Sequence, residues 1–128
     1  MATLTVGSGK DYSTIALAVA AANDNDTIQI YAGTYNETNI GLYDDGITFE
    51  APDGEDVLCS GSNWASDYLI HSYGEFTSYN NLKFTGYRYA PQRRGGGGSH
   101  KFSMSGTIIY NCGGVSDSTI EIGGPWYL

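Results

Sequence analysis

The chain has 128 residues, of which 14 are acidic and six are basic, and its formal net charge is −8. This length predicts one domain that buries roughly two thirds of the surface of the unfolded chain. The negative charge argues against duplex nucleic acid and anionic membranes as partners, because both carry charge of the same sign. No apolar stretch approaches the roughly 18 residues that a bilayer-spanning helix needs, so membrane insertion is not expected.

The first predicted element is a helix over residues 14–22, with Ser13 as its N-cap. Apolar residues at i, i+3, i+4 and i+7 form one face of this helix: Ile15, Ala18, Val19 and Ala22. The remaining positions are apolar as well, including Ala16, Leu17 and Ala20. Since a surface helix ordinarily keeps a polar face toward water, this composition predicts a second contact for the helix.

Short β-branched or aromatic runs separated by Gly, Asn or Asp turns make up the rest of the chain. These runs predict strands, none longer than about five residues: 27–31, 47–50, 57–59, 68–71, 81–85, 107–110 and 118–122. Ile28, Thr48 and Leu69 recur at a nearly constant spacing, which is in the range of solenoid repeats.

A flexible loop is predicted near residues 88–100, where the sequence reads Arg-Arg-Gly-Gly-Gly-Gly-Ser over 93–99. The composition is that of a natural surface loop and equally that of an engineered linker between two native segments. Both interpretations stay open. Five of the six basic residues lie in and around it: Lys83, Arg88, Arg93, Arg94 and Lys101.

The stretch 6–37 resembles the amino-terminal cap and first coil of right-handed parallel β-helix proteins, the pectin-lyase-like group. The matching residues are Gly7, Ser8, Gly9, Tyr12, Thr14, Ile15, Asp26, Thr27, Ile28, Gly33, Thr34, Tyr35 and Glu37. The resemblance implies an all-β fold, a right-handed parallel β-helix (β-solenoid) of about four coils. Residues 1–128 would form a single domain, with a helical cap over 1–26 and coils over 27–128. Proteins of this group include esterases, lyases, adhesins and phage tail parts, so the resemblance does not fix a function.

No catalytic motif accompanies this pattern. His71 lies in a predicted strand, where we expect it to face water, and His100 lies across the loop. The acidic pairs at 44–45 and 55–56 have the hard oxygen ligands that Ca²⁺ prefers, but each adjoins a turn glycine, where solvated carboxylates are common. We therefore expect neither catalysis nor a required cofactor, with Ca²⁺ at the acidic turns as the alternative.

Cys59 and Cys112 are the two cysteines of the chain. They are compatible with one disulfide in an oxidising compartment and with two buried thiols. The sequence does not separate these alternatives.

The leading functional hypothesis is self-association, because both ends of the chain are apolar. The predicted contact joins the outer face of the cap helix to the carboxyl terminus, with six residues: Ala16, Leu17, Ala20, Trp126, Tyr127 and Leu128. A head-to-tail contact of this kind is heterologous and propagates into a filament unless a rotation closes it. We expect a structural module, extracellular or on a cell or particle surface.

The alternative hypothesis is a carbohydrate-binding or carbohydrate-active β-helix, such as a shortened esterase or lyase. Exposed tyrosines would stack on sugar rings: Tyr68, Tyr73, Tyr79, Tyr87 and Tyr89. Arg88, Arg93 and Arg94 would pair with the carboxylates of an anionic polysaccharide. A third hypothesis, a minimised engineered scaffold, would account for the glycine run.

Overall fold

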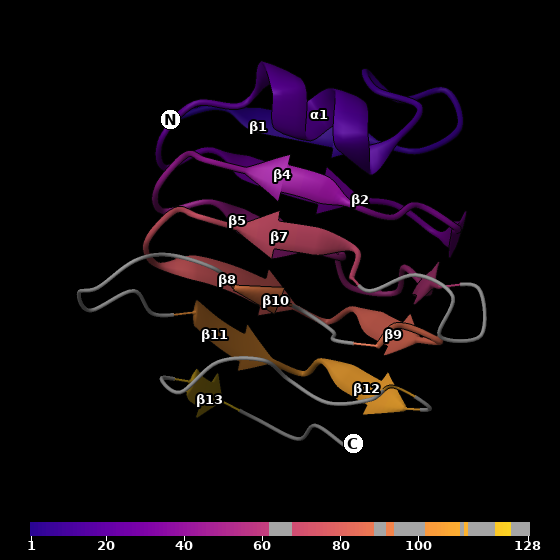
Figure 1. The fold of residues 1–128 in the computed structure, drawn as a ribbon. Coiled ribbons are helices and arrows are strands. Elements are labelled where there is room, and N and C mark those ends of the chain that lie inside the picture. The colour runs from indigo at the N-terminus through magenta and orange to yellow at the C-terminus, as the bar shows by residue number, and fades with distance from the viewer. Residues whose placement is uncertain (62–67, 89–91, 94–101, 111, 113–119, 124–128) are drawn as a thin grey trace.

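The computed structural model describes residues 1–61, 68–88, 92–93, 102–110, 112 and 120–123. These residues form short strands and one helix, and every pairing between strands is parallel. Figure 1 shows the strands stacked along one axis, from β1 at one end to β13 at the other. The predicted parallel β-solenoid of about four coils is confirmed.

Three parallel sheets build the stack, and sheet A is the longest of them. Sheet A has the order β1 (Thr3–Val6), β2 (Thr27–Ile30), β5 (Thr48–Glu50), β8 (Thr77–Asn80), β11 (Phe102–Ser105) and β13 (Ile120–Gly123). Sheet B has the order β3 (Gly33–Tyr35), β6 (Val57–Ser60), β9 (Lys83–Thr85) and β12 (Ile108–Tyr110). Sheet C has the order β4 (Ile40–Leu42), β7 (Ile70–Ser72) and β10 (Gln92–Arg93). A full coil therefore takes one strand from each sheet.

The core is built from columns of like side chains, because parallel pairing in register places each apolar residue beside its counterpart in the next coil. In sheet A the strand registers align one such column, in the order Leu4, Ile28, Phe49, Tyr79 and Met104. All five side chains are buried. The rings of Phe49 and Tyr79 stack with centroids 5.4 Å apart. Single strands this short bury little, so the stacking of coils provides most of the apolar burial.

The repeat is less regular than the sequence spacing predicts. Ile28 pairs with Phe49 of the next coil, in agreement with the predicted interval. The prediction that Leu69 continues the same row was wrong, because Leu69 directly precedes β7 of sheet C. The row of Ile28 and Phe49 continues instead at Tyr79, and Thr48 pairs with Ser78. Residues 61–69 join β6 to β7, whereas residues 36–39 suffice between β3 and β4, and this longer connection lengthens the coil.

The helix α1 (Ile15–Ala21) begins one residue later than predicted. Its N-cap is Thr14 and not Ser13, because the Thr14 hydroxyl accepts a hydrogen bond from the Leu17 N–H at 3.2 Å. In Figure 1, α1 lies at the amino-terminal end of the stack, beside β1 and next to β4. In the described part of the chain, no helix combines the length and apolar character needed to cross a membrane.

Candidate functional site

The cap helix is held by its core face and by a carboxylate outside it. Ile15, Ala18 and Val19 are its buried residues and pack on the core. The Glu37 carboxylate accepts hydrogen bonds from the N–H groups of Ile15 and Ala16, at 2.8 and 2.9 Å. These two bonds satisfy donors that a helix start otherwise leaves open. The position of α1 is thus fixed from two sides.

The outer face of α1 is exposed and uncharged. Ala16, Leu17 and Ala20 all lie on it, and Leu17 is the largest, with 52% of its surface exposed. Helix α1 contains no acidic or basic residue. The structure divides this predicted patch into two parts: Ala16 and Ala20 line a groove on the side of the solenoid, whereas Leu17 does not. The other predicted members of the contact, Trp126, Tyr127 and Leu128, lie outside the described residues.

The amino-terminal edge of sheet A is partly closed by the chain itself. Tyr12 forms a parallel bridge with Val6, its N–H donates to the Thr5 carbonyl and its carbonyl accepts from the Gly7 N–H, each at 2.9 Å. The carboxylate of Asp11 also accepts from the Thr5 hydroxyl, at 3.2 Å. At the other end of sheet A, β13 pairs with β11 and is the last strand in the order. The amino-terminal end of the stack thus carries a helix beside a partly covered strand edge.

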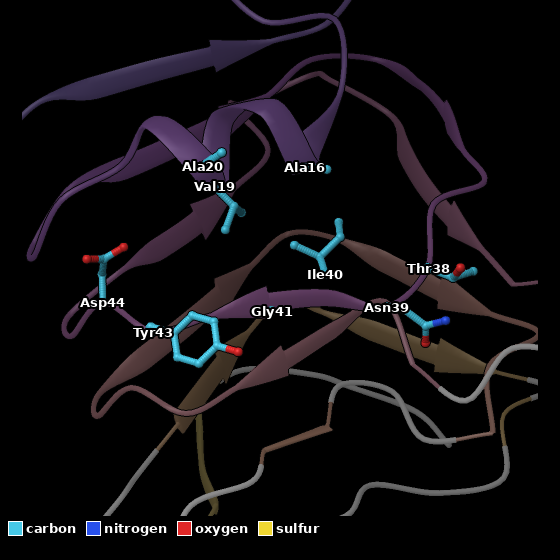
Figure 2. Close-up of a pocket in the computed structure, with 9 residues that line it drawn as sticks. All are labelled: Ala16, Val19, Ala20, Thr38, Asn39, Ile40, Gly41, Tyr43 and Asp44. Carbon is cyan, nitrogen blue, oxygen red and sulfur yellow. The ribbon is translucent and has the colours of Figure 1, made fainter.

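A groove of about 430 Å³ lies between α1 and β4. Figure 2 shows Ala16, Val19 and Ala20 on the helix side and Ile40 and Tyr43 on the strand side. Polar lining comes from three further residues: Thr38, Asn39 and Asp44. The sequence hypotheses did not include this groove.

An aromatic row on the outside of sheet C leads into the groove. The rings of Tyr43 and Tyr73 are stacked, with centroids 4.8 Å apart and planes 1° apart. Tyr73 also stacks on His71, whose ring contacts Tyr68 edge-on. Tyr43 has 73% of its surface exposed. A signal for this pair was present in the sequence, since Ile40-Gly-Leu-Tyr43 and Ile70-His-Ser-Tyr73 share one pattern, an isoleucine followed three positions later by a tyrosine.

The predictions that Tyr79, Tyr87 and His71 are exposed were wrong. Tyr79 and Tyr87 are buried at 1% and 0% exposure, because both face the core of the solenoid. The hydroxyl of Tyr87 donates to the Glu37 carbonyl at 2.6 Å, and burial raises the pKa of Tyr87. His71 is 5% exposed, covered by Tyr68 and Tyr73, and so does not face water. Tyr89 and His100 lie outside the described residues.

Of the three arginines predicted to contact an anionic ligand, the structure describes Arg88 and the backbone of Arg93. Arg88 is exposed and follows β9. Arg93 is the last residue of β10, at the register position opposite Ser72 of β7. Arg94, and most of the loop predicted near 88–100, lie outside the described residues.

The acidic turns have structural roles. Asp45 accepts from the N–H of Glu75 at 2.8 Å, and Asp24 accepts from the N–H of Asp45 at 2.9 Å, so carboxylates link successive coils. In the second acidic pair, Glu55 accepts from the Ala32 N–H at 2.8 Å and Asp56 forms an ion pair with Lys83 at 2.6 Å. Among the described residues, no three His, Cys, Asp or Glu side chains gather closely enough to hold a metal ion.

Both cysteines are free thiols. Cys59 is buried in sheet B between Tyr35 and Phe84 of the neighbouring strands, and this burial raises its pKa strongly. Cys112 is half-buried, and desolvation raises its pKa as well. The structure therefore has two unbridged thiols and no disulfide between Cys59 and Cys112.

Comparison of the chain with protein-family models, with curated proteins and with solved structures found no match. The function of the chain is therefore inferred from its own geometry.

Proposed function

We propose that this chain is a non-catalytic, structural β-solenoid module that self-associates head-to-tail, on the outside of a cell or particle. The observation that carries the proposal is the exposure of the Leu17 side chain. Its side chain is 52% exposed on a helix without charged residues, at the amino-terminal end of the stack. An exposed leucine alone is ordinary, but one on an uncharged outer helix face offers a contact surface.

Leu17 is too small to hold two copies together alone. Complete burial of a leucine contributes about 1.5–3 kcal/mol, whereas association costs about 4–15 kcal/mol in lost freedom of motion. The partner surface must therefore add larger apolar groups. The carboxyl-terminal Trp126 and Tyr127 are of the right kind, since a buried aromatic side chain covers about 150–250 Å².

The partly covered edge of β1 favours contact through α1 over direct addition of a strand at this end. Tyr12 and Asp11 already occupy part of the outer edge of β1, so simple addition of another strand along the whole of β1 is hindered. The uncharged face of α1 is the more accessible contact at this end. A contact between α1 of one copy and the carboxyl-terminal end of the next is heterologous, and it repeats along the stack axis.

The proposal includes a distant relation to the pectin-lyase-like group. Its support is the resemblance over residues 6–37 together with the parallel solenoid and its capping helix. Glu37, one of the matching residues, caps that helix directly. A sugar-binding role through the arginines has weaker support, because Arg94 and the side chain of Arg93 lie outside the described part of the chain.

Multi-angle light scattering over a range of protein concentrations, at low and high salt, tests the assembly. The wild type is expected to grow in mass with concentration, and Leu17→Asp is expected to stay monomeric. Phe76→Asp is the matched control, because Phe76 is 57% exposed on the turn between β7 and β8, away from α1. A wild type that stays monomeric under all conditions, or a Phe76→Asp variant that dissociates equally, contradicts the proposal.

A further inference from the structure

We propose that the groove between α1 and β4 binds a neutral pyranose sugar, with the Tyr43 ring as its stacking platform. One face of this ring is covered by the parallel ring of Tyr73 at 4.8 Å. The ring also lines the groove, and its residue is 73% exposed. An aromatic ring held flat by a second ring offers its remaining face without a further loss of side-chain freedom on binding.

Gly41 makes room for this platform. A Cβ at position 41 would lie 3.2 Å from Cε2 of Tyr43 and 3.5 Å from its hydroxyl oxygen, so the ring lies directly over the backbone of β4. In the next coil His71 occupies the equivalent position, opposite Gly41 in the register. Because Gly41 has no side chain, the ring of Tyr43 can lie over the backbone of β4, where it lines the groove.

Besides a stacking surface, a sugar needs hydrogen-bonding partners for its hydroxyl groups, and the polar lining of the groove can supply them. Thr38, Asn39 and Asp44 line the groove with a hydroxyl, an amide and a carboxylate. Within the part of the chain that the structure describes, no hydrogen bond engages these three side chains. They supply both donors and acceptors along the groove: in Figure 2, Asp44 lies at the Tyr43 end of β4, and Thr38 and Asn39 lie at its other end.

Charge and size select the class of sugar. The groove lining contains Asp44 and no basic residue, so the carboxylate of a uronic acid would be repelled. A neutral sugar has no such penalty. The volume of about 430 Å³ falls in the range of small-molecule sites, about 300–1,000 Å³.

This inference goes beyond assembly, and Leu17 separates the two because it does not line the groove. Binding is therefore measured on the Leu17→Asp variant by isothermal titration calorimetry and saturation-transfer NMR. The probes are cellobiose, maltose, lactose and galacturonic acid. At least one of the three neutral disaccharides is expected to bind, and galacturonic acid is expected to bind more weakly.

Substitutions on the same background locate the site. Tyr43→Ala is expected to weaken binding by about tenfold, and Gly41→Ala is expected to weaken it by displacing the ring, whereas Tyr43→Phe keeps most of the affinity. Tyr110→Ala is the control, since Tyr110 is a 39% exposed tyrosine of β12 in sheet B. The inference is overturned if no neutral disaccharide binds, if Tyr43→Ala binds as well as its parent, or if galacturonic acid binds most tightly. Circular dichroism establishes that each variant is folded.

Discussion

The carbonyl oxygen of Gly86 lies only 2.6 Å from the point where a Cβ on Gly61 would stand. The two glycines lie directly after β6 and β9, neighbouring strands of sheet B, and the Gly61 N–H donates to the Thr85 carbonyl at 2.8 Å. Successive coils therefore touch through bare backbone at this corner. Neither residue tolerates a side chain without separating the coils.

Gly61→Ala is accordingly expected to lower the free energy of unfolding by about 1–3 kcal/mol, the usual cost of forcing an extra methyl group into a packed site. Urea denaturation followed by circular dichroism measures the change. Thr34→Ala, on the exposed side of β3, is the control and should change stability little. Equal stabilities of Gly61→Ala and the wild type would show that the coils do not approach this closely.

Removal of the external helix cap should loosen α1. Glu37→Ala deletes the acceptor of the Ile15 and Ala16 N–H groups and is expected to cost about 0.5–2 kcal/mol, as loss of a cap commonly does. Amide hydrogen exchange should show faster exchange at these two N–H groups. Glu50→Ala on β5 provides a control of the same charge change. Unchanged exchange in Glu37→Ala would contradict the assigned cap.

Asp26 should make stability depend on acid pH. Its carboxylate accepts from the N–H groups of Asn23 and Ala2, at 2.8 and 2.7 Å, and these bonds lower its pKa below the ordinary aspartate value. The unfolded chain then binds the proton more readily than the folded chain. The stabilisation is therefore complete above about pH 4 and is lost as the pH falls through the lowered pKa.

The melting temperatures of the wild type and Asp26→Asn between neutral and strongly acidic pH test this expectation. The variant should melt at a lower temperature at neutral pH, and the gap should close at the acid end. Asp53→Asn, in an exposed turn, should follow the wild type throughout. A gap that stays constant with pH would exclude the proposed role of the carboxylate.

The two thiols should differ in reactivity. Because Cys59 is wholly buried and its pKa is strongly raised, native protein should incorporate iodoacetamide at Cys112 first, with Cys59 labelled only on unfolding. Mass spectrometry of the peptides distinguishes the sites. Rapid labelling of Cys59 in folded protein, or a disulfide on a non-reducing gel, would contradict the described core.

The fold class could be predicted because a solenoid requires short apolar strands separated by turns, and this pattern is recognisable in the sequence. Short β-branched runs between turns indicated strands at 27–31 and 57–59, and β2 and β6 lie there. Strands such as β4 and β8 were not predicted, since Ile-Gly-Leu and Thr-Ser-Tyr-Asn have too little local propensity and depend on pairing with the next coil.

The candidate sites were harder to predict than the fold. The outer face of α1 followed from its apolar composition, because helical periodicity fixes which residues face the core. The groove did not follow, since Tyr43 and the helix come together only when sheet C stacks beside α1. Tyr79 was misassigned because β8 itself was not predicted, so no alternation placed its side chain on the core face, and Tyr87 follows β9 outside the strands.

X-ray fibre diffraction from the concentrated wild-type protein tests the head-to-tail assembly most directly. Six strands in sheet A, each spaced by about 4.8 Å from the next, give an axial length of about 30 Å for one copy. We expect filaments with a meridional reflection near that strand spacing and an axial repeat at or slightly above the length of one copy. A protein that yields only isolated particles of one-copy mass, with no axial order at any concentration, would contradict the account.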